Sequence, residues 1–174
     1  MENLRTNASC PTSVWRRIVM GRNPRVTLIR AGILAAVCFV LFGFMLKPLR
    51  VEGPSMLPSY RDGSINLLNR LAYRSSAPKR GDVVCIKTTG MHHLYMKRVV
   101  GLPGERIAIF DGLVFINGKP LDEPYVAERA DWNLTEKQLG PDEYIVIGDN
   151  RSMDQRWHSW GTVPREKIVG KVLW

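Results

Sequence analysis

The sequence predicts an all-β domain that follows one N-terminal membrane helix, and three observations lead to this prediction. The run Ala31–Leu46 contains no charged residue. Beyond it lie short segments rich in Val, Ile and aromatic residues, and two of the intervening turns carry Asp111-Gly112 and Asn117-Gly118. A chain of 174 residues can form one compact domain with a short appendage.

The apolar run predicts a membrane anchor over residues 31–47. As a helix it would be about 24 Å long, slightly short of a hydrocarbon core of roughly 30 Å. Arg30 and Lys47 flank the run, and their long side chains can reach the headgroups. A buried or surface helix of a soluble domain is disfavoured because every face is apolar. A cleaved secretory signal is disfavoured because no small-x-small site follows the run.

The N-terminal residues 1–30 form a basic tail, which we expect to stay in the cytoplasm. They contain six arginines against the single acid Glu2, and they supply much of the net charge of +9. By the positive-inside tendency, we expect residues 48–174 to form an extracytoplasmic β domain. No zinc-finger, helix-turn-helix or RNP-type pattern is present, so we predict no nucleic-acid partner.

The cysteines and histidines predict neither a disulfide framework nor a metal site. Cys10, Cys38 and Cys85 are odd in number and lie in the tail, the apolar run and a probable strand. His92 and His93 are adjacent and His158 is distant, which is not a ligand spacing. We therefore expect no metal and no cofactor.

The strands after the anchor suggest a curled sheet or barrel-like domain. The pairs Asp111-Gly112 and Asn117-Gly118 tolerate the positive φ angles of two-residue hairpin turns. Residues 122–142 read as a polar excursion between strands. The predicted strands are Ser64–Leu68, Asp82–Lys87, Tyr95–Val100, Arg106–Phe110, Leu113–Ile116, Glu143–Gly148 and Ile168–Val172.

Three stretches carry candidate chemistry, although each also has a plain structural reading. Ser55 lies between Gly53-Pro54 and Met56, in a segment that can hold a sharp, exposed backbone or simply form a turn. The polar run 148–156 follows an apolar strand, and it can either form a solvated turn or support a site through fixed hydrogen bonds.

Lys97 lies in the third stretch, within a predicted strand. Alternation places it on one face with Tyr95 and Val99, pointing inward, while Arg98 points outward. Burial disfavours the ammonium form and would lower the lysine pKa, leaving a neutral amine that can take a proton from a serine hydroxyl. The alternative is a solvated lysine at a sheet edge.

Taken together and in order, these stretches resemble the type I signal peptidases, the Ser-Lys family that removes leader peptides from exported proteins. The resemblance extends over roughly residues 30–172. Four segments carry it, namely Gly53–Pro58, Gly81–Val84, Lys97–Gly104 and Gly148–Arg151.

The resemblance implies specific roles for residues of this chain. Ser55 would attack the scissile carbonyl, and Lys97 would accept its proton and deliver it to the leaving amine, with no metal or cofactor. The backbone N–H of Ser55 would stabilise the oxyanion. Shallow pockets for small residues at positions −1 and −3 of the leader would be lined by Val51, Met56, Tyr95 and Met96.

Two departures from the family pattern concern the support of the site. Some members carry a serine two residues before the nucleophile as a second oxyanion donor, whereas this chain has Gly53. The last segment is two residues shorter than the usual pattern. With a gap, Ser152 orients the lysine, and Asp154 and Arg156 form a supporting ion pair; without one, Asp154 takes the place of that serine. The gapped register is preferred because three side chains then match in type.

The resemblance also implies partners and location. These are preproteins with signal peptides, membrane lipid and the protein export machinery, at a bacterial plasma membrane. An enzyme of the mitochondrial inner membrane with the same chemistry is the alternative, and a tethered module that binds leaders without cutting is another. A self-cleaving repressor is disfavoured because a membrane span occupies the N-terminus, where a DNA-binding domain would be needed.

Overall fold

The computed structural model describes residues 23–87, 94–154 and 161–173. The chain divides into two units, residues 1–44 and 45–174. In the first unit, helix α2 (Pro24–Met45) has no buried residue, and Pro24 at its start suits a position where no backbone N–H is needed. Among the described residues, α2 is the one helix long and apolar enough to cross a membrane, with a mean hydropathy of 2.3.

The larger sheet of the second unit has seven strands, each antiparallel to its neighbours. Their order is β1-β2-β11-β3-β4-β9-β10. The strands are β1 (Leu46–Arg50), β2 (Ile65–Asn69), β3 (Val83–Lys87), β4 (Leu94–Gly101), β9 (Glu143–Ile147), β10 (Gly161–Pro164) and β11 (Ile168–Leu173).

The smaller sheet has four antiparallel strands in the order β7-β6-β5-β8. They are β5 (Arg106–Phe110), β6 (Leu113–Ile116), β7 (Lys119–Pro120) and β8 (Leu134–Gln138). Asp111 (φ 48°) and Gly112 (φ 71°) form the turn between β5 and β6, as the glycine pair predicted. Asn117 (φ 52°) and Gly118 (φ 78°) do the same between β6 and β7.

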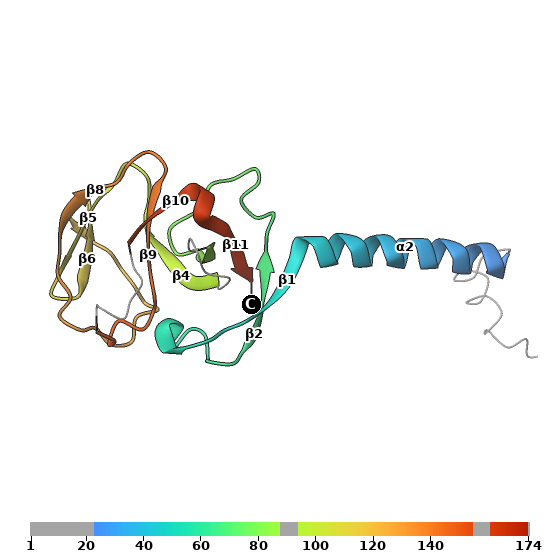
Figure 1. Cartoon of the computed structure of the whole chain (residues 1–174), viewed down its shortest axis with the longest axis horizontal. Helices are drawn as coiled ribbons and strands as arrows, with labels where there is room; N and C mark the ends of the chain where they lie inside the picture. Colours follow the sequence, from blue (N-terminus) through green and yellow to red (C-terminus); the bar gives the residue numbers. More distant parts are fainter. Residues whose placement is uncertain (1–22, 88–93, 155–160, 174) are drawn as a thin grey trace, which may run out of the picture. The chain divides into compact units, whose positions relative to one another are not determined.

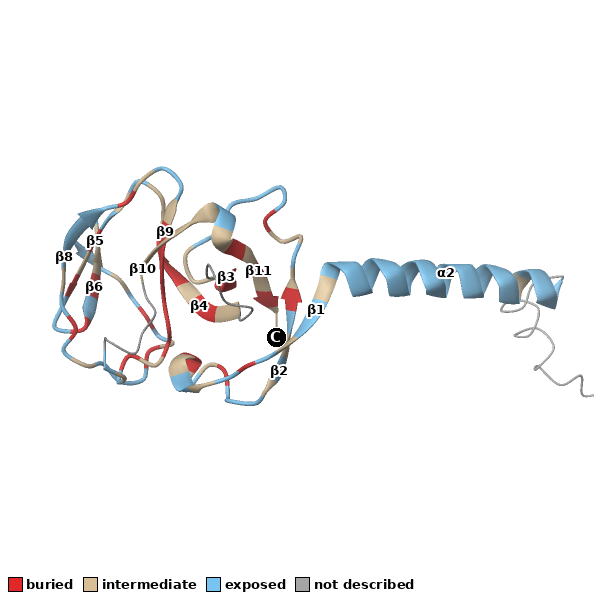
Figure 2. Ribbon diagram, viewed as in Figure 1, coloured by how far each residue is buried: buried red, intermediate tan, exposed pale blue. Residues whose placement is uncertain are grey.

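Three apolar clusters hold the second unit together. Alternate residues of β3 separate two of them: Val83 and Cys85 lie in one cluster with Met56, while Val84 and Ile86 lie in the other. The third cluster joins Ile145 of the larger sheet to residues of the smaller one. Figure 1 shows β9 between β4 and the β5–β6–β8 group, and Figure 2 shows the buried residues concentrated in the central strands.

The predicted fold class is confirmed, because a mostly β domain follows one apolar helix. Both sheets are open rather than closed into a barrel. All seven predicted strands are present, each within about one residue of its expected limits. The prediction missed β1, β7, β8 and β10. Residues of these strands are half-buried or exposed and lack the apolar alternation of a central strand. The predicted polar excursion 122–142 contains β8.

Candidate active site

Ser55 lies on a short 3-10 helix, η1 (Pro54–Met56), which follows a glycine-dependent turn. Gly53 has φ 89°, a conformation that side chains disfavour, and its N–H donates to Asp62 Oδ1 at 2.9 Å. Met56, 1% exposed, packs into the apolar cluster on the other side of the serine. The turn is therefore fixed before and after Ser55. Sequence reasoning did not identify Asp62.

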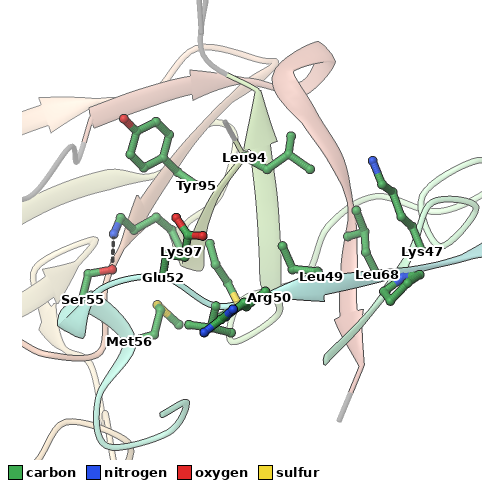
Figure 3. A pocket seen from close by; sticks show the side chains of 13 residues that line it. Lys47, Leu49, Arg50, Glu52, Ser55, Met56, Leu68, Leu94, Tyr95 and Lys97 are labelled. Carbon is green, nitrogen blue, oxygen red and sulfur yellow. Dashed lines mark hydrogen bonds between the residues drawn. The ribbon is translucent and has the colours of Figure 1, made fainter. Parts of the chain in front are cut away.

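Lys97 projects from β4 toward the nucleophile. It pairs with Val84 of β3, is 3% exposed, and its Nζ donates a hydrogen bond to Ser55 Oγ at 2.7 Å. The prediction that Lys97 points inward is therefore confirmed. Figure 3 shows the Nζ turned toward Ser55 at one end of the pocket. The fold joins two residues that are 42 positions apart in the chain.

The environment of Lys97 makes its neutral form more accessible than that of a solvent-exposed lysine. Burial lowers the pKa of Lys97 from 10.5 to about 8, and the nearby negative charge of Asp149 opposes this shift in part. With a pKa near 8, roughly a tenth of the molecules carry a neutral Lys97 at pH 7. The pair can thus transfer a proton from the serine hydroxyl to the amine without any further base.

Arg98 does not point outward into solvent, contrary to the expectation from strand alternation. Its Nε and Nη2 donate to the two carboxylate oxygens of Asp149 at 2.8 and 2.5 Å, and its Nη1 donates to the Gly81 carbonyl at 2.7 Å. The Asp149 side chain is fully buried. The guanidinium also stacks on Tyr125, 4.1 Å from the ring centroid. The loop after β9 covers this face of β4, so both faces of the strand are occupied.

Arg151 forms a second buried ion pair next to the first. Its Nη2 lies 2.5 Å from Glu123 Oε1, and both side chains are 1% exposed. The Arg151 Nε donates to the Gly148 carbonyl, and Tyr125 donates its hydroxyl to Glu123 at 2.8 Å. Glu123 was not among the predicted site residues, because nothing near position 123 marks it as a partner for a residue 28 positions later.

Asn150 contacts the nucleophile turn, and Ser152 contacts Asn150 rather than the lysine. The Asn150 N–H donates to the Ser55 carbonyl and its Nδ2 to the Pro54 carbonyl, both at 3.1 Å. Ser152 Oγ donates to Asn150 Oδ1 at 2.7 Å, not to Lys97 as the gapped register implied. Asp154 is exposed, and Arg156 lies outside the described residues, so their ion pair stays a prediction.

The four residues predicted to form substrate pockets all line one groove of about 440 Å³, together with Ser55 and Lys97. Val51, Met56 and Met96 are buried and supply apolar surface. In Figure 3 Ser55 lies toward one end and Lys47 at the other. The further lining residues are Lys47, Pro48, Leu49, Arg50, Glu52, Leu68 and Leu94.

Comparisons with known proteins identify a family to which the chain is similar. The family model described as signal peptidase, peptidase S26, matches residues 25–174. A probable signal peptidase I-2 of Synechocystis is 31% identical over 99% of this chain and 78% of its own length. The signal peptidase I of Leptolyngbya laminosa is 29% identical over 82% of this chain and 74% of its own.

A solved signal peptidase I from Enterococcus faecalis is 27% identical, covers 56% of this chain and 98% of its own, and superposes with a TM-score of 0.46. The family match over most of the chain identifies the class: the protein is a peptidase. Within that class, the chain belongs to the signal peptidase I family, as the resemblance predicted. Its N-terminal apolar helix fits a membrane-anchored member of this family.

Proposed function

We propose that this protein is a membrane-anchored serine endopeptidase that removes N-terminal signal peptides from exported preproteins, with Ser55 as nucleophile and Lys97 as general base. The observation that carries the proposal is the 2.7 Å contact between a buried lysine amine and a serine hydroxyl in a groove that also exposes apolar side chains. Family membership supports the same substrate class.

The reaction begins with neutral Lys97. Its amine takes the hydroxyl proton as Ser55 Oγ attacks the scissile carbonyl, which forms a tetrahedral intermediate. Lys97 then gives that proton to the leaving amine, the C–N bond breaks, and the mature protein departs. Water, deprotonated by Lys97, next attacks the ester on Ser55, and the signal peptide leaves as the free acid while the serine recovers its proton.

The oxyanion is stabilised by backbone rather than by a second hydroxyl. We assign the Ser55 N–H as donor, since it belongs to the nucleophile itself. A serine at position 53 is disfavoured because φ there is 89°. The Gly53 N–H is already used by Asp62, which holds the turn. This accounts in physical terms for the glycine at a position where some family members carry a serine.

The groove fits the end of a signal peptide with small residues at positions −1 and −3. Val51, Met56, Tyr95 and Met96 leave shallow apolar surface beside Ser55. The α2 helix anchors the enzyme in a bacterial plasma membrane, with the basic tail in the cytoplasm and the β domain outside. Lipid and the export machinery are the further partners in this proposal.

The test is cleavage of a preprotein by the purified full-length chain in detergent. A substrate with Ala-x-Ala before the junction should be cut once, after the second alanine, as read by N-terminal sequencing of the product. Substrates with a bulky residue at −1 or −3 serve as matched controls and should stay intact. The absence of cleavage, or cleavage of all substrates alike, would contradict the proposed function.

A further inference from the structure

Asn150 holds two carbonyls of the nucleophile turn, one of which, that of Pro54, also accepts from the Leu57 N–H at 3.1 Å. Asn150 donates its backbone N–H to the Ser55 carbonyl and its side-chain Nδ2 to the Pro54 carbonyl, each at 3.1 Å. These two carbonyls belong to the peptide bonds immediately before and after the nucleophile. A movement of Asn150 would therefore be transmitted directly to the position of Ser55 Oγ.

The orientation of the Asn150 amide decides whether its Nδ2 can donate to the Pro54 carbonyl. An amide turned by 180° would point its oxygen at the Pro54 carbonyl, two acceptors would face each other, and the bond would be lost. The Pro54 carbonyl, which can only accept, therefore sets the orientation of the amide, and Asn150 Oδ1 then faces Ser152. The Ser152 hydroxyl donates to this Oδ1 at 2.7 Å and restrains the side chain in the position that reaches Pro54. The relay runs from Ser152 through Asn150 to the backbone of Ser55.

We propose that Ser152 is a positioning residue that acts on the nucleophile turn through Asn150, and not on the general base. This inference rests on the proposed function of Ser55 and Lys97. The base has its own determinants: Lys97 is buried in β4, bonds directly to Ser55, and has Asp149 as its charged neighbour. Loss of Ser152 should therefore lower kcat while leaving the ionisation of Lys97 unchanged.

A double-mutant cycle separates the two roles. Ser152→Ala should lower kcat about 3- to 10-fold, the range expected for one net hydrogen bond, with KM nearly constant. Asn150→Asp keeps the shape but has no donor for the Pro54 carbonyl, and it should lower kcat about 100-fold. Adding Ser152→Ala to Asn150→Asp should change kcat less than 2-fold, because the relay is already broken.

The pH profile separates a role on the nucleophile turn from a role on the base, and rescue by a hydroxyl separates positioning from a merely structural role. For Ser152→Ala the midpoint of the rise of kcat/KM with pH should coincide with that of the wild type. Ser152→Thr should restore kcat to within 2-fold, since it keeps the hydroxyl. Ser76→Ala, which removes an exposed hydroxyl bonded to the Ala72 carbonyl, is the matched control and should match the wild type.

Two results would overturn the proposal. A shift of the pH midpoint in Ser152→Ala would show that the hydroxyl acts on Lys97, and additive losses in the cycle would show that Ser152 and Asn150 act independently. Thermal unfolding identifies variants that do not fold; if Asn150→Asp is one of them, Asn150→Ala replaces it in the cycle with the same expectation. The proposed function fails separately, if the wild type does not cleave or Ser55→Ala remains active.

Discussion

Two buried basic side chains lie in neighbouring parts of the domain, and they differ in whether a carboxylate contacts them. Arg151, 1% exposed, faces the carboxylate of Glu123, which is equally buried. Lys97, 3% exposed, has a neutral hydroxyl, that of Ser55, at hydrogen-bond distance within the described part of the chain. The guanidinium keeps its charge and needs a counter-charge, whereas the amine can release its proton.

The difference separates a buried charge that stabilises the fold from a buried amine to which we assign the catalytic role. A paired arginine fixes geometry because its removal or unpairing is strongly unfavourable. A buried lysine without a contacting counter-charge destabilises the fold, and in the proposed mechanism the same environment allows it to act as a base near neutral pH. Substitutions at the two sites should therefore differ sharply: those at Lys97 should abolish activity and spare the fold, and those at the Arg151 pair should destabilise the fold.

The largest expected effect is on turnover. Ser55→Ala and Lys97→Ala should each lower kcat/KM by about 10⁴-fold or more, and the double variant should be little worse than either, because both residues serve one step. Lys97→Arg should be equally inactive, since a guanidinium cannot accept the proton. Initial rates on an Ala-x-Ala preprotein measure this. Retained activity of Lys97→Ala, with one of His92, His93 or His158 then essential, would point instead to a histidine base.

The next largest effect is on folding stability at the paired arginine. Glu123→Gln leaves the buried guanidinium of Arg151 without its counter-charge and should lower the free energy of unfolding by about 3–5 kcal/mol. Glu136→Gln is the matched control, because its ion pair with Arg106 is about half exposed and should contribute less than about 1 kcal/mol. Denaturant unfolding of the full chain in detergent compares them. Equal losses would contradict the structural role assigned to Glu123.

Substitution of Lys97 should increase the folding stability, whereas Glu123→Gln should decrease it. Its pKa of about 8 in the folded chain lies below the unfolded value, so the unfolded state binds more protons between about pH 8 and 10.4. Stability should rise with pH through this window. Below it the buried charge destabilises the fold by roughly 3 kcal/mol. Lys97→Met should thus be more stable than wild type at pH 7, and the gain should disappear toward pH 10.5. A pH-independent difference would refute this account.

The smallest effect concerns the pH dependence of cleavage. Wild-type kcat/KM should rise with pH through about 8, as Lys97 loses its proton. The charge of Asp149 raises the pKa of Lys97, so Asp149→Asn should move the midpoint to lower pH. Profiles measured on folded enzyme test the direction of this shift. A midpoint that stays in place or moves to higher pH would show that Asp149 does not act on the base.

Sequence reasoning succeeded where the determinants are local or are carried by a family pattern. The continuous apolar run of β3 and the Asp-Gly and Asn-Gly pairs of the hairpins depend on neighbouring residues, and both were predicted. The placement of Ser55 and Lys97 followed from the resemblance. Glu123 and Asp62 could not be predicted, because each becomes important only through a partner that the fold brings near.

Ser152 shows a further limit of the sequence. The residue type matched the family pattern, yet its hydroxyl bonds to Asn150. Residue matching cannot distinguish a bond to the lysine from a bond to the nucleophile turn, since both use a single hydroxyl. Arg98 likewise does not point into solvent as strand alternation predicted. A loop supplies Asp149, 51 positions later in the chain, on the face that was expected to meet solvent.

Pro48 of β1 bears on self-association. β1 is the outermost strand of the larger sheet, and Val51 directs its N–H toward Ser64 of the neighbouring segment. By alternation, position 48 faces the open edge, where proline offers no donor. A strand from a second copy could not complete a regular ladder along this edge. The enzyme can therefore keep an open strand edge beside its groove with little tendency to aggregate through it.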